Sequence, residues 1–271
     1  PYLTNYYGNA SSIYRFGQEA KEVVNESRET IAKCLNADTK EIYFTSGGTE
    51  ADNWAIKGVA DALSKKGNHI ITSAIEHHAI LHTCEFLEKH GYEVTYLPVD
   101  ENGLVNPDDL EKAITDKTIL VSVMFANNEI GTIQPIKKLA EIAHNHDVYF
   151  HTDAVQAVAH VEIDVKEMNI DLMSVTAHKI YGPKGTGALY VKKGVKLHPY
   201  IHGGGQEFKR RAGTENVAGI VAMGKALELM IEEKMAELSS AQDMDVQMEI
   251  MTVIGEYNKA RTRLNNELGR V

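Results

Sequence analysis

The sequence predicts an α/β protein with three layers, α/β/α, around a mostly parallel sheet. Short apolar runs with the length of strands alternate with longer segments whose apolar residues recur at helical spacing. This alternation is typical of βαβ units, which place successive strands parallel and cover both faces of the sheet with helices. The run at 118–124 (TILVSVM) is apolar almost throughout, as expected of a strand buried on both faces.

The predicted elements follow in a regular order after an irregular lead-in at 1–16. A helix at 17–35 is predicted from its apolar stripe, and an Asn-Pro pair predicts the start of a helix near residue 107. Strands are predicted where short apolar runs end at turn-forming residues. The other predicted helices lie at 50–63, from about 77, at 135–144 and at 217–238, and the predicted strands at 41–45, 69–74, 92–97, 118–124, 148–153, up to Thr176, and at 187–191, the last folding back antiparallel.

Composition narrows the range of functions. The chain has 271 residues, of which 43% are hydrophobic and 24% charged, as in typical globular proteins. Its net charge is −10 and it has no long basic run, which argues against nucleic acid and anionic membranes as partners. No apolar run approaches about 18 residues and no signal peptide is visible, so a cytoplasmic location is the default expectation.

The two cysteines, Cys34 and Cys84, lack the spacing of metal ligands. They fit reduced thiols in a cytosolic protein. Each lies in or beside an apolar helical stripe, so we expect core packing for both rather than nucleophilic chemistry. The sequence therefore predicts no metal site.

Two turns suggest anion binding. The residues Ser46 to Thr49 (SGGT) leave free backbone N–H groups at the start of a helix, where the helix dipole also favours negative charge. The pattern is neither a P-loop nor GxGxxG, and by itself a plain glycine turn explains it equally well. Later in the chain, Arg210, Arg211 and Thr214 form a polar, basic turn suited to an anion.

Polar residues follow three other predicted strands, at the edge where α/β folds place their chemistry. His77 can stack on a flat ring or relay protons, or simply begin a helix. Asp153 ends a buried strand, where a carboxylate needs a partner such as a protonated ring nitrogen. Lys179 can form a Schiff base with an aldehyde cofactor if burial removes its proton. A lone lysine is more often a solvated surface charge, so the argument depends on the combination.

Seven motifs occur in order and carry a family resemblance. They are TSGGTE (45–50), EHHA (76–79), ANNEIG (126–131), HTDAVQ (151–156), AHKIYGPKG (177–185), HGGGQE (202–207) and RAGT (211–214). Over about residues 5 to 235 the chain resembles the cysteine desulfurases of the NifS type. These are pyridoxal-phosphate enzymes of the class-V aminotransferases, with the aspartate-aminotransferase fold, so the resemblance implies the large domain of that fold.

The resemblance implies roles for individual residues. Lys179 is implied to hold pyridoxal phosphate covalently and to move protons at the substrate carbon, and His77 to stack on the ring and assist acid–base steps. Asp153 is implied to pair with the ring nitrogen, keeping it protonated, and Gln156 to hydrogen-bond the phenolic oxygen. The other implied contacts are with the cofactor phosphate or the substrate carboxylate, and they come from Gly48, Thr49, Asn128, Thr176, His178 and Thr214. Thr214 is implied to reach the phosphate of a second subunit, which implies a homodimer.

The implied reaction converts L-cysteine to L-alanine. A cysteine of the enzyme accepts the sulfur as a persulfide, which passes to an iron–sulfur scaffold protein or another acceptor. In the family, a small C-terminal domain carries that cysteine and an arginine for the substrate carboxylate; this chain matches neither, and Cys34 and Cys84 match no catalytic position. We therefore expect a piece of a longer desulfurase, with a cofactor-binding large domain at 1–238 and a helical tail at 239–271. The alternatives are a shortened pyridoxal-phosphate aminotransferase or lyase, and an inactive scaffold protein of this fold.

Overall fold

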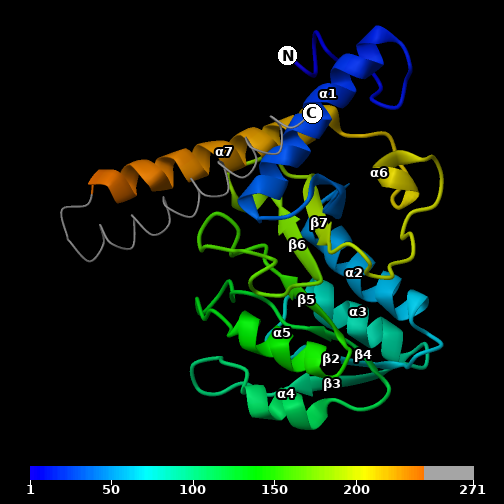
Figure 1. Ribbon diagram of the computed structural model, residues 1–271, viewed down its shortest axis with the longest axis vertical. Coiled ribbons are helices and arrows are strands. Elements are labelled where there is room, and N and C mark those ends of the chain that lie inside the picture. Colours follow the sequence, from blue (N-terminus) through cyan, green and yellow to red (C-terminus); the bar gives the residue numbers. More distant parts are fainter. Residues whose placement is uncertain (241–271) are drawn as a thin grey trace, which may run out of the picture.

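A seven-stranded sheet forms the centre of the computed structural model, which describes residues 1–240 (Figure 1). The strand order is β1-β7-β6-β5-β4-β2-β3. The strands from β3 to β6 pair in parallel, whereas β7 runs antiparallel to both β6 and β1. The mostly parallel sheet and the strand that folds back at 187–191 are therefore confirmed.

The elements lie within a few residues of the predicted positions. The strands are β1 (Ile42–Thr45), β2 (His69–Ser73), β3 (Glu93–Leu97), β4 (Thr118–Ser122), β5 (Tyr149–Asp153), β6 (Leu172–Thr176) and β7 (Gly187–Val191). The helices are α1 (Arg15–Cys34), α2 (Gly48–Ala62), α3 (His78–Glu88), α4 (Pro107–Ala113), α5 (Ile136–Asn145), α6 (Gln206–Lys209) and α7 (Val217–Ser240). The helix α2 begins at Gly48 rather than at residue 50, so part of the predicted turn already belongs to its first turn.

Alternation along the strands divides the apolar core between the two faces of the sheet. Side chains one residue apart, such as Ile70 and Ile71 in β2 or Leu120 and Val121 in β4, belong to different apolar clusters. One cluster includes Trp54 of α2 and Ile80 of α3, and the other is covered by α1, α5 and α7. Helices on both faces confirm the three-layer architecture.

The parallel strands all point toward one edge of the sheet. Because β7 runs the other way, it begins at that edge, where Gly187 pairs with Thr45 of β1 and Thr176 of β6. Three polar residues, Thr45, Asp153 and Thr176, each end a strand at this edge.

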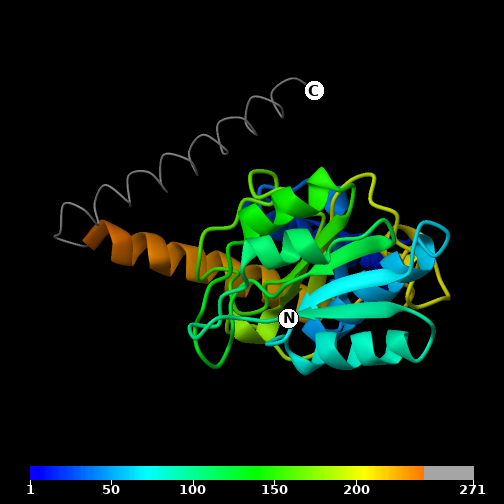
Figure 2. The same ribbon diagram turned by 90° about the horizontal axis from the view of Figure 1, so that it is seen from below.

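The helix α7 packs on α1, and its far end extends away from the α/β body (Figures 1 and 2). Within residues 1–240, none of the helices is both long and apolar enough to span a membrane. The predicted helical tail at 239–271 falls almost entirely outside the described residues, so the predicted division into two parts stays untested.

A buried ion pair ties α1 to the segment before α7. Arg28 and Glu207 are each 6% exposed, and two hydrogen bonds of 2.8 Å join guanidinium and carboxylate. Glu207 also accepts the N–H of Phe44, and Arg28 donates to the carbonyl of Ile42. Glu207, Phe208 and Lys209 all have positive φ, a backbone that side chains rarely adopt, so α6 depends on this support.

We predict that Glu207→Ala lowers the free energy of unfolding by about 3–5 kcal/mol, because Arg28 would remain buried without its partner. The exposed pair Arg15–Glu19 provides a matched control, since solvent screens this pair and Arg15→Ala should lower the free energy of unfolding far less. Urea unfolding followed by circular dichroism measures both. Equal losses in the two variants would show that the buried pair does not hold α6 in place.

Candidate cofactor-binding site

The turn between β1 and α2 has the geometry of an anion site. Gly47 caps α2 with φ +148°, a conformation that favours glycine. Among the described residues, no acceptor is found for the N–H groups of Gly48 and Thr49, which lie at the positive end of the helix dipole. The hydroxyl of Thr176 lies beside this turn, 3.8 Å from where a Cβ on Gly47 would be.

Glycine at the start of β7 lets the turn settle against the sheet. A Cβ on Gly187 would lie 2.7 Å from the Cα of Gly47 and 2.6 Å from the carbonyl oxygen of Val175. No larger residue fits there without displacing backbone. On the other side, a Cβ on Gly48 would contact Val155 at 2.7 Å. The turn, β6 and the segment after β5 therefore form one continuous surface.

Asp153 lies at the end of β5, where sequence analysis placed it. It is 6% exposed, and its Oδ1 accepts the N–H of Val155 at 2.9 Å. Burial raises the pKa of this carboxyl, while the N–H bond and the nearby imidazole of His77 lower it. Gln156 is half-buried in the turn that follows. The structure thus holds a buried carboxyl group at the end of β5, whose ionised form a positively charged ligand group would stabilise.

His77 and Asn128 both line a cleft with a volume of about 310 Å³. His77 caps α3, and its Nδ1 accepts the N–H of Ala79, which places the ring proton on Nε2. Asn128 is exposed, whereas its neighbour Asn127 holds the loop by bonds to Ile75, Glu129 and Ile130. The imidazole and the Asn128 amide are therefore both available to a ligand.

Lys179 follows β6 directly, at the end of a 3-10 turn, Ala177–Lys179. The turn closes through bonds from the N–H groups of Ile180 and Gly182 to the carbonyl of Ala177. Lys179 is exposed in this chain, so the burial expected from the sequence is not found among the described residues. His178 is exposed beside it, and its Nδ1 lies 3.0 Å from the hydroxyl of Thr176.

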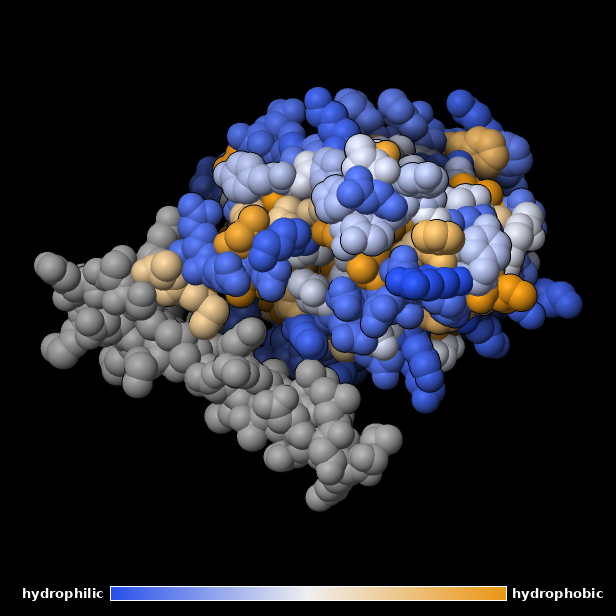
Figure 3. Space-filling model, turned by 90° about the horizontal axis from the view of Figure 1, so that it is seen from above, coloured by the Kyte–Doolittle hydropathy of each residue, from blue (hydrophilic) through white to orange (hydrophobic). Residues whose placement is uncertain are grey.

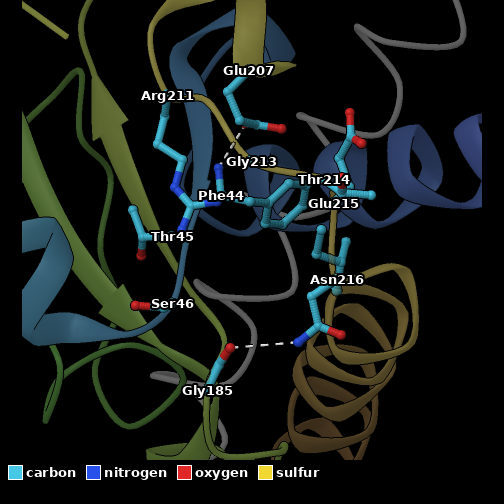
Figure 4. Close-up of a pocket in the computed structure, with 11 residues that line it drawn as sticks. Phe44, Thr45, Ser46, Gly185, Glu207, Arg211, Gly213, Thr214, Glu215 and Asn216 are labelled. Carbon is cyan, nitrogen blue, oxygen red and sulfur yellow. Dashed lines mark hydrogen bonds between the residues drawn. The ribbon is translucent and has the colours of Figure 1, made fainter. Parts of the chain in front are cut away.

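A second cleft of about 140 Å³ lies beside the glycine turn (Figure 4). Thr214 lines it together with Ser46 and Gly185, and Thr214 itself is exposed. The basic turn predicted to bind an anion differs from expectation. Arg211 already pairs with Glu50 through two hydrogen bonds of 2.7 and 2.9 Å, so its charge is neutralised within the chain.

The sequence did not predict three buried polar side chains at the cleft that His77 and Asn128 line. Asp52 is 1% exposed, Glu76 is 6% exposed, and His151 is fully buried. One signal was present, because Asp52 shares a helical face with the apolar residues Ile56 and Val59. The others could not be found from local pattern, since their proximity depends on how β2, β5 and α2 pack.

These features together fit pyridoxal phosphate. The free N–H groups of the glycine turn suit its phosphate, the carboxylate of Asp153 suits a protonated ring nitrogen, and the imidazole of His77 suits the face of the ring. Lys179 supplies the amine at the edge where the ring would lie. Each requirement of the cofactor meets a group of matching chemistry.

Comparisons with known proteins identify the family of the chain. Residues 1–268 match the family described as aminotransferase class-V. A protein named cysteine desulfurase IscS from Clostridium botulinum is 65% identical over 232 residues, which cover 86% of this chain and 58% of that protein. One of the same name from Methanosarcina thermophila is 64% identical, with the same coverage. The chain therefore spans less than two thirds of the length of these relatives.

Solved structures give the same result. A NifS-like protein superposes with a TM-score of 0.84 and 41% identity, covering 88% of this chain and 68% of the other. The structure described as SspA in complex with cysteine superposes with a TM-score of 0.82 and 44% identity, over 84% of this chain and 66% of the other. The chain therefore belongs to the class-V aminotransferase family, whose cofactor is pyridoxal phosphate.

Proposed function

We propose that the protein containing this chain is a cysteine desulfurase, which takes sulfur from L-cysteine and releases L-alanine. The observation that carries the proposal is the identity of 65% to a cysteine desulfurase over 232 residues, which cover 86% of this chain. A similar solved structure holds cysteine, which supports the same substrate class here.

The proposed residue roles are those that the family resemblance implies, and the placement of the residues supports them. The N–H groups of Gly48 and Thr49, with the side chains of Thr176 and His178, bind the phosphate. Asp153 holds the ring nitrogen protonated, Gln156 bonds the phenolic oxygen, and His77 covers the ring face. When bound, pyridoxal phosphate supplies an electron-accepting ring.

Two further residues act on the substrate in this proposal. Lys179 holds the cofactor covalently and then moves a proton at the substrate Cα. Its position at the open end of β6 gives the amine access to that carbon. Asn128 lies in the cleft with His77, where its amide orients the substrate carboxylate.

Sulfur transfer needs a thiolate that neither cysteine of this chain provides. Burial raises the pKa of both Cys34 and Cys84 to about 12, so neither thiol ionises at neutral pH. In the proposed reaction, another cysteine thiol attacks the substrate sulfur. The Cβ–S bond of L-cysteine breaks, a persulfide forms on the attacking thiol, and Cβ takes a proton to give L-alanine. An iron–sulfur scaffold protein or another cytoplasmic acceptor then receives the sulfur.

We also propose that the protein is a homodimer. Several large apolar side chains are exposed near the N-terminus, including Leu3 at 83%, Ile13 at 94% and Phe16 at 66%. On the face seen in Figure 3, apolar side chains lie scattered among hydrophilic ones. Exposed apolar groups of this kind favour a contact with another protein surface. The exposed position of Thr214 suits a residue that reaches a partner's site.

Lys179 is the first residue to test. Borohydride reduction in the presence of pyridoxal phosphate should add a pyridoxyl group to the peptide that contains Lys179, as read by mass spectrometry. Lys179→Ala should remove the adduct, whereas Lys184→Ala should retain it, because Lys184 is also exposed but lies beyond the turn. Labelling elsewhere, or none at all, would contradict the assigned role.

The substrate is tested with the whole protein. L-Cysteine should yield equal amounts of L-alanine and transferred sulfur, and His77→Ala should lower this rate by about 10²–10⁴-fold, the usual contribution of an acid–base group. An amino-acid-dependent spectral change without sulfur release would instead favour an aminotransferase or lyase. No spectral change with any amino acid would favour the scaffold alternative.

The dimer is tested by sedimentation. We expect twice the monomer mass for the cofactor-loaded protein, and Phe16→Asp should shift the equilibrium toward monomer, because a charge at an apolar contact is costly. Leu229→Asp is the control, since Leu229 is also exposed at 51% but lies on α7. A monomer in the unsubstituted protein would contradict the proposal.

A further inference from the structure

Three buried carboxyl groups and one buried histidine lie together under the cleft. Asp52 comes from α2, Glu76 from the loop after β2, and Asp153 from the end of β5, and each is 6% exposed or less. His151 of β5 is fully buried, with its Nε2 3.8 Å from Oδ1 of Asp52. We name these four residues the floor cluster.

In the described part of the chain, the three carboxyl groups of the floor cluster have no lysine or arginine as a partner. Within residues 1–240, no lysine or arginine forms an ion pair with any of its carboxyl groups. Nor does any group of three or more side chains in that range have the arrangement of metal ligands. Buried carboxylates without cations repel one another and are poorly solvated, so protons must remain on some of them.

His151 does not provide the missing charge. Its Nδ1 lies 2.8 Å from the hydroxyl of Ser122, and its Nε2 lies 3.0 Å from the hydroxyl of Ser174. Burial lowers the pKa of His151 to about 3, so the ring is neutral. It acts as a hydrogen-bonding spacer between two strands rather than as a counter-ion.

Hydrogen bonding distinguishes the three carboxyl groups. Oδ1 of Asp52 and Oε2 of Glu76 are buried and have no partner, and an unpartnered buried oxygen is a natural place for a proton. Oε1 of Glu76 accepts from Ser73 and from the N–H of Met124. Asp153 differs, because neither of its oxygens is an orphan of this kind and it lies near His77.

The direction of the pKa shifts agrees with this division. Burial and the charges of Asp153 and Glu76 raise the pKa of Asp52 well above its usual value, although a hydrogen bond with Ser174 opposes the shift. Burial raises the pKa of Glu76 to about 8, against the lowering effect of its hydrogen bonds. The pKa of Asp153 is also raised by burial, but the N–H of Val155 and the imidazole of His77 oppose the shift.

We propose that Asp52 and Glu76 are positioning residues that keep their protons, so that Asp153 carries the single negative charge of the floor cluster. The charge is then not shared with Asp52 or Glu76, and Asp153 can pair with the protonated ring nitrogen of the cofactor. The inference depends on the proposed role of Asp153 in cofactor binding. Asp52 and Glu76 touch no reacting atom and act only through Asp153.

The first test measures cofactor affinity. Asp52→Asn and Glu76→Gln replace a neutral acid by a neutral amide of the same shape, so the dissociation constant for pyridoxal phosphate at pH 7 should stay within about two-fold of the unsubstituted protein. Asp153→Asn removes the proposed charge and should weaken binding by about ten-fold or more. If either amide variant binds as weakly as Asp153→Asn, that residue carries the charge and the proposal is wrong.

The second test needs no cofactor. Infrared difference spectra of the cofactor-free protein at pH 7 should show the carbonyl band of protonated carboxylic acids. Asp52→Asn and Glu76→Gln should each remove part of that band, and Asp153→Asn should remove none. Asp171→Asn is the matched control, because this buried carboxylate has His144 at 2.6 Å and Lys192 at 3.6 Å as partners and should contribute no acid band.

The pH dependence of the band gives a further check on the same protein. The part that belongs to Glu76 should disappear as the pH rises through about 8. The titratable groups near Glu76 are the acids Asp52, Asp153 and Cys84, together with His77 and His78, which line the same cleft. A wild-type protein without an acid band, or a band lost in Asp153→Asn, would overturn the proposal. Because this readout is independent of pyridoxal phosphate, it separates failure of the floor cluster from failure of the proposed function.

Discussion

The burial of the sheet on both faces is the constraint on which the rest of the structure depends. Apolar side chains alternate into two cores, so the interior of the sheet has little room for unpaired polar groups. Some polar residues inside the strands are paired, as His151 is with Ser174, and others lie where the strands end. Asp153, Thr176 and Thr45 each occupy the last position of a strand at the same edge. The candidate site therefore lies at the edge of the sheet where these polar residues end their strands.

The antiparallel strand β7 completes that edge. It lies between β1 and β6, so the glycine turn after β1 comes to rest beside Thr176 although the two are far apart in sequence. Gly187 allows the close approach, because a side chain there would collide with Gly47. The ion pair between Arg28 and Glu207 then fixes the later loop against β1. The glycine turn, the 3-10 turn that ends at Lys179 and the loop that carries Thr214 are thus held by a single group of strands.

The charges near the glycine turn and the charges of the floor cluster are balanced in different ways. Arg211 and Glu50 neutralise each other beside the glycine turn, and Arg28 and Glu207 do so behind it. The floor cluster has no such cation in the described part of the chain. A site that is to receive a positively charged ring nitrogen needs an anion that is not already neutralised by the protein. Leaving one carboxylate of the cluster without a cation, and keeping the others neutral, meets that need.

The sequence alone predicted the order and type of the elements, the mostly parallel sheet and the residues of the glycine turn. These depend on apolar periodicity and on turn chemistry, which are local properties of the chain. It also predicted Lys179, His77 and Asp153 as candidate site residues, because each lies at or just after the end of a predicted strand. Only the tertiary structure decided that Glu50 neutralises Arg211, that Lys179 is exposed, and that Asp52 and Glu76 meet under Asp153. Those contacts join residues from separate strands and helices. The local sequence pattern of one element does not determine which other elements lie beside it.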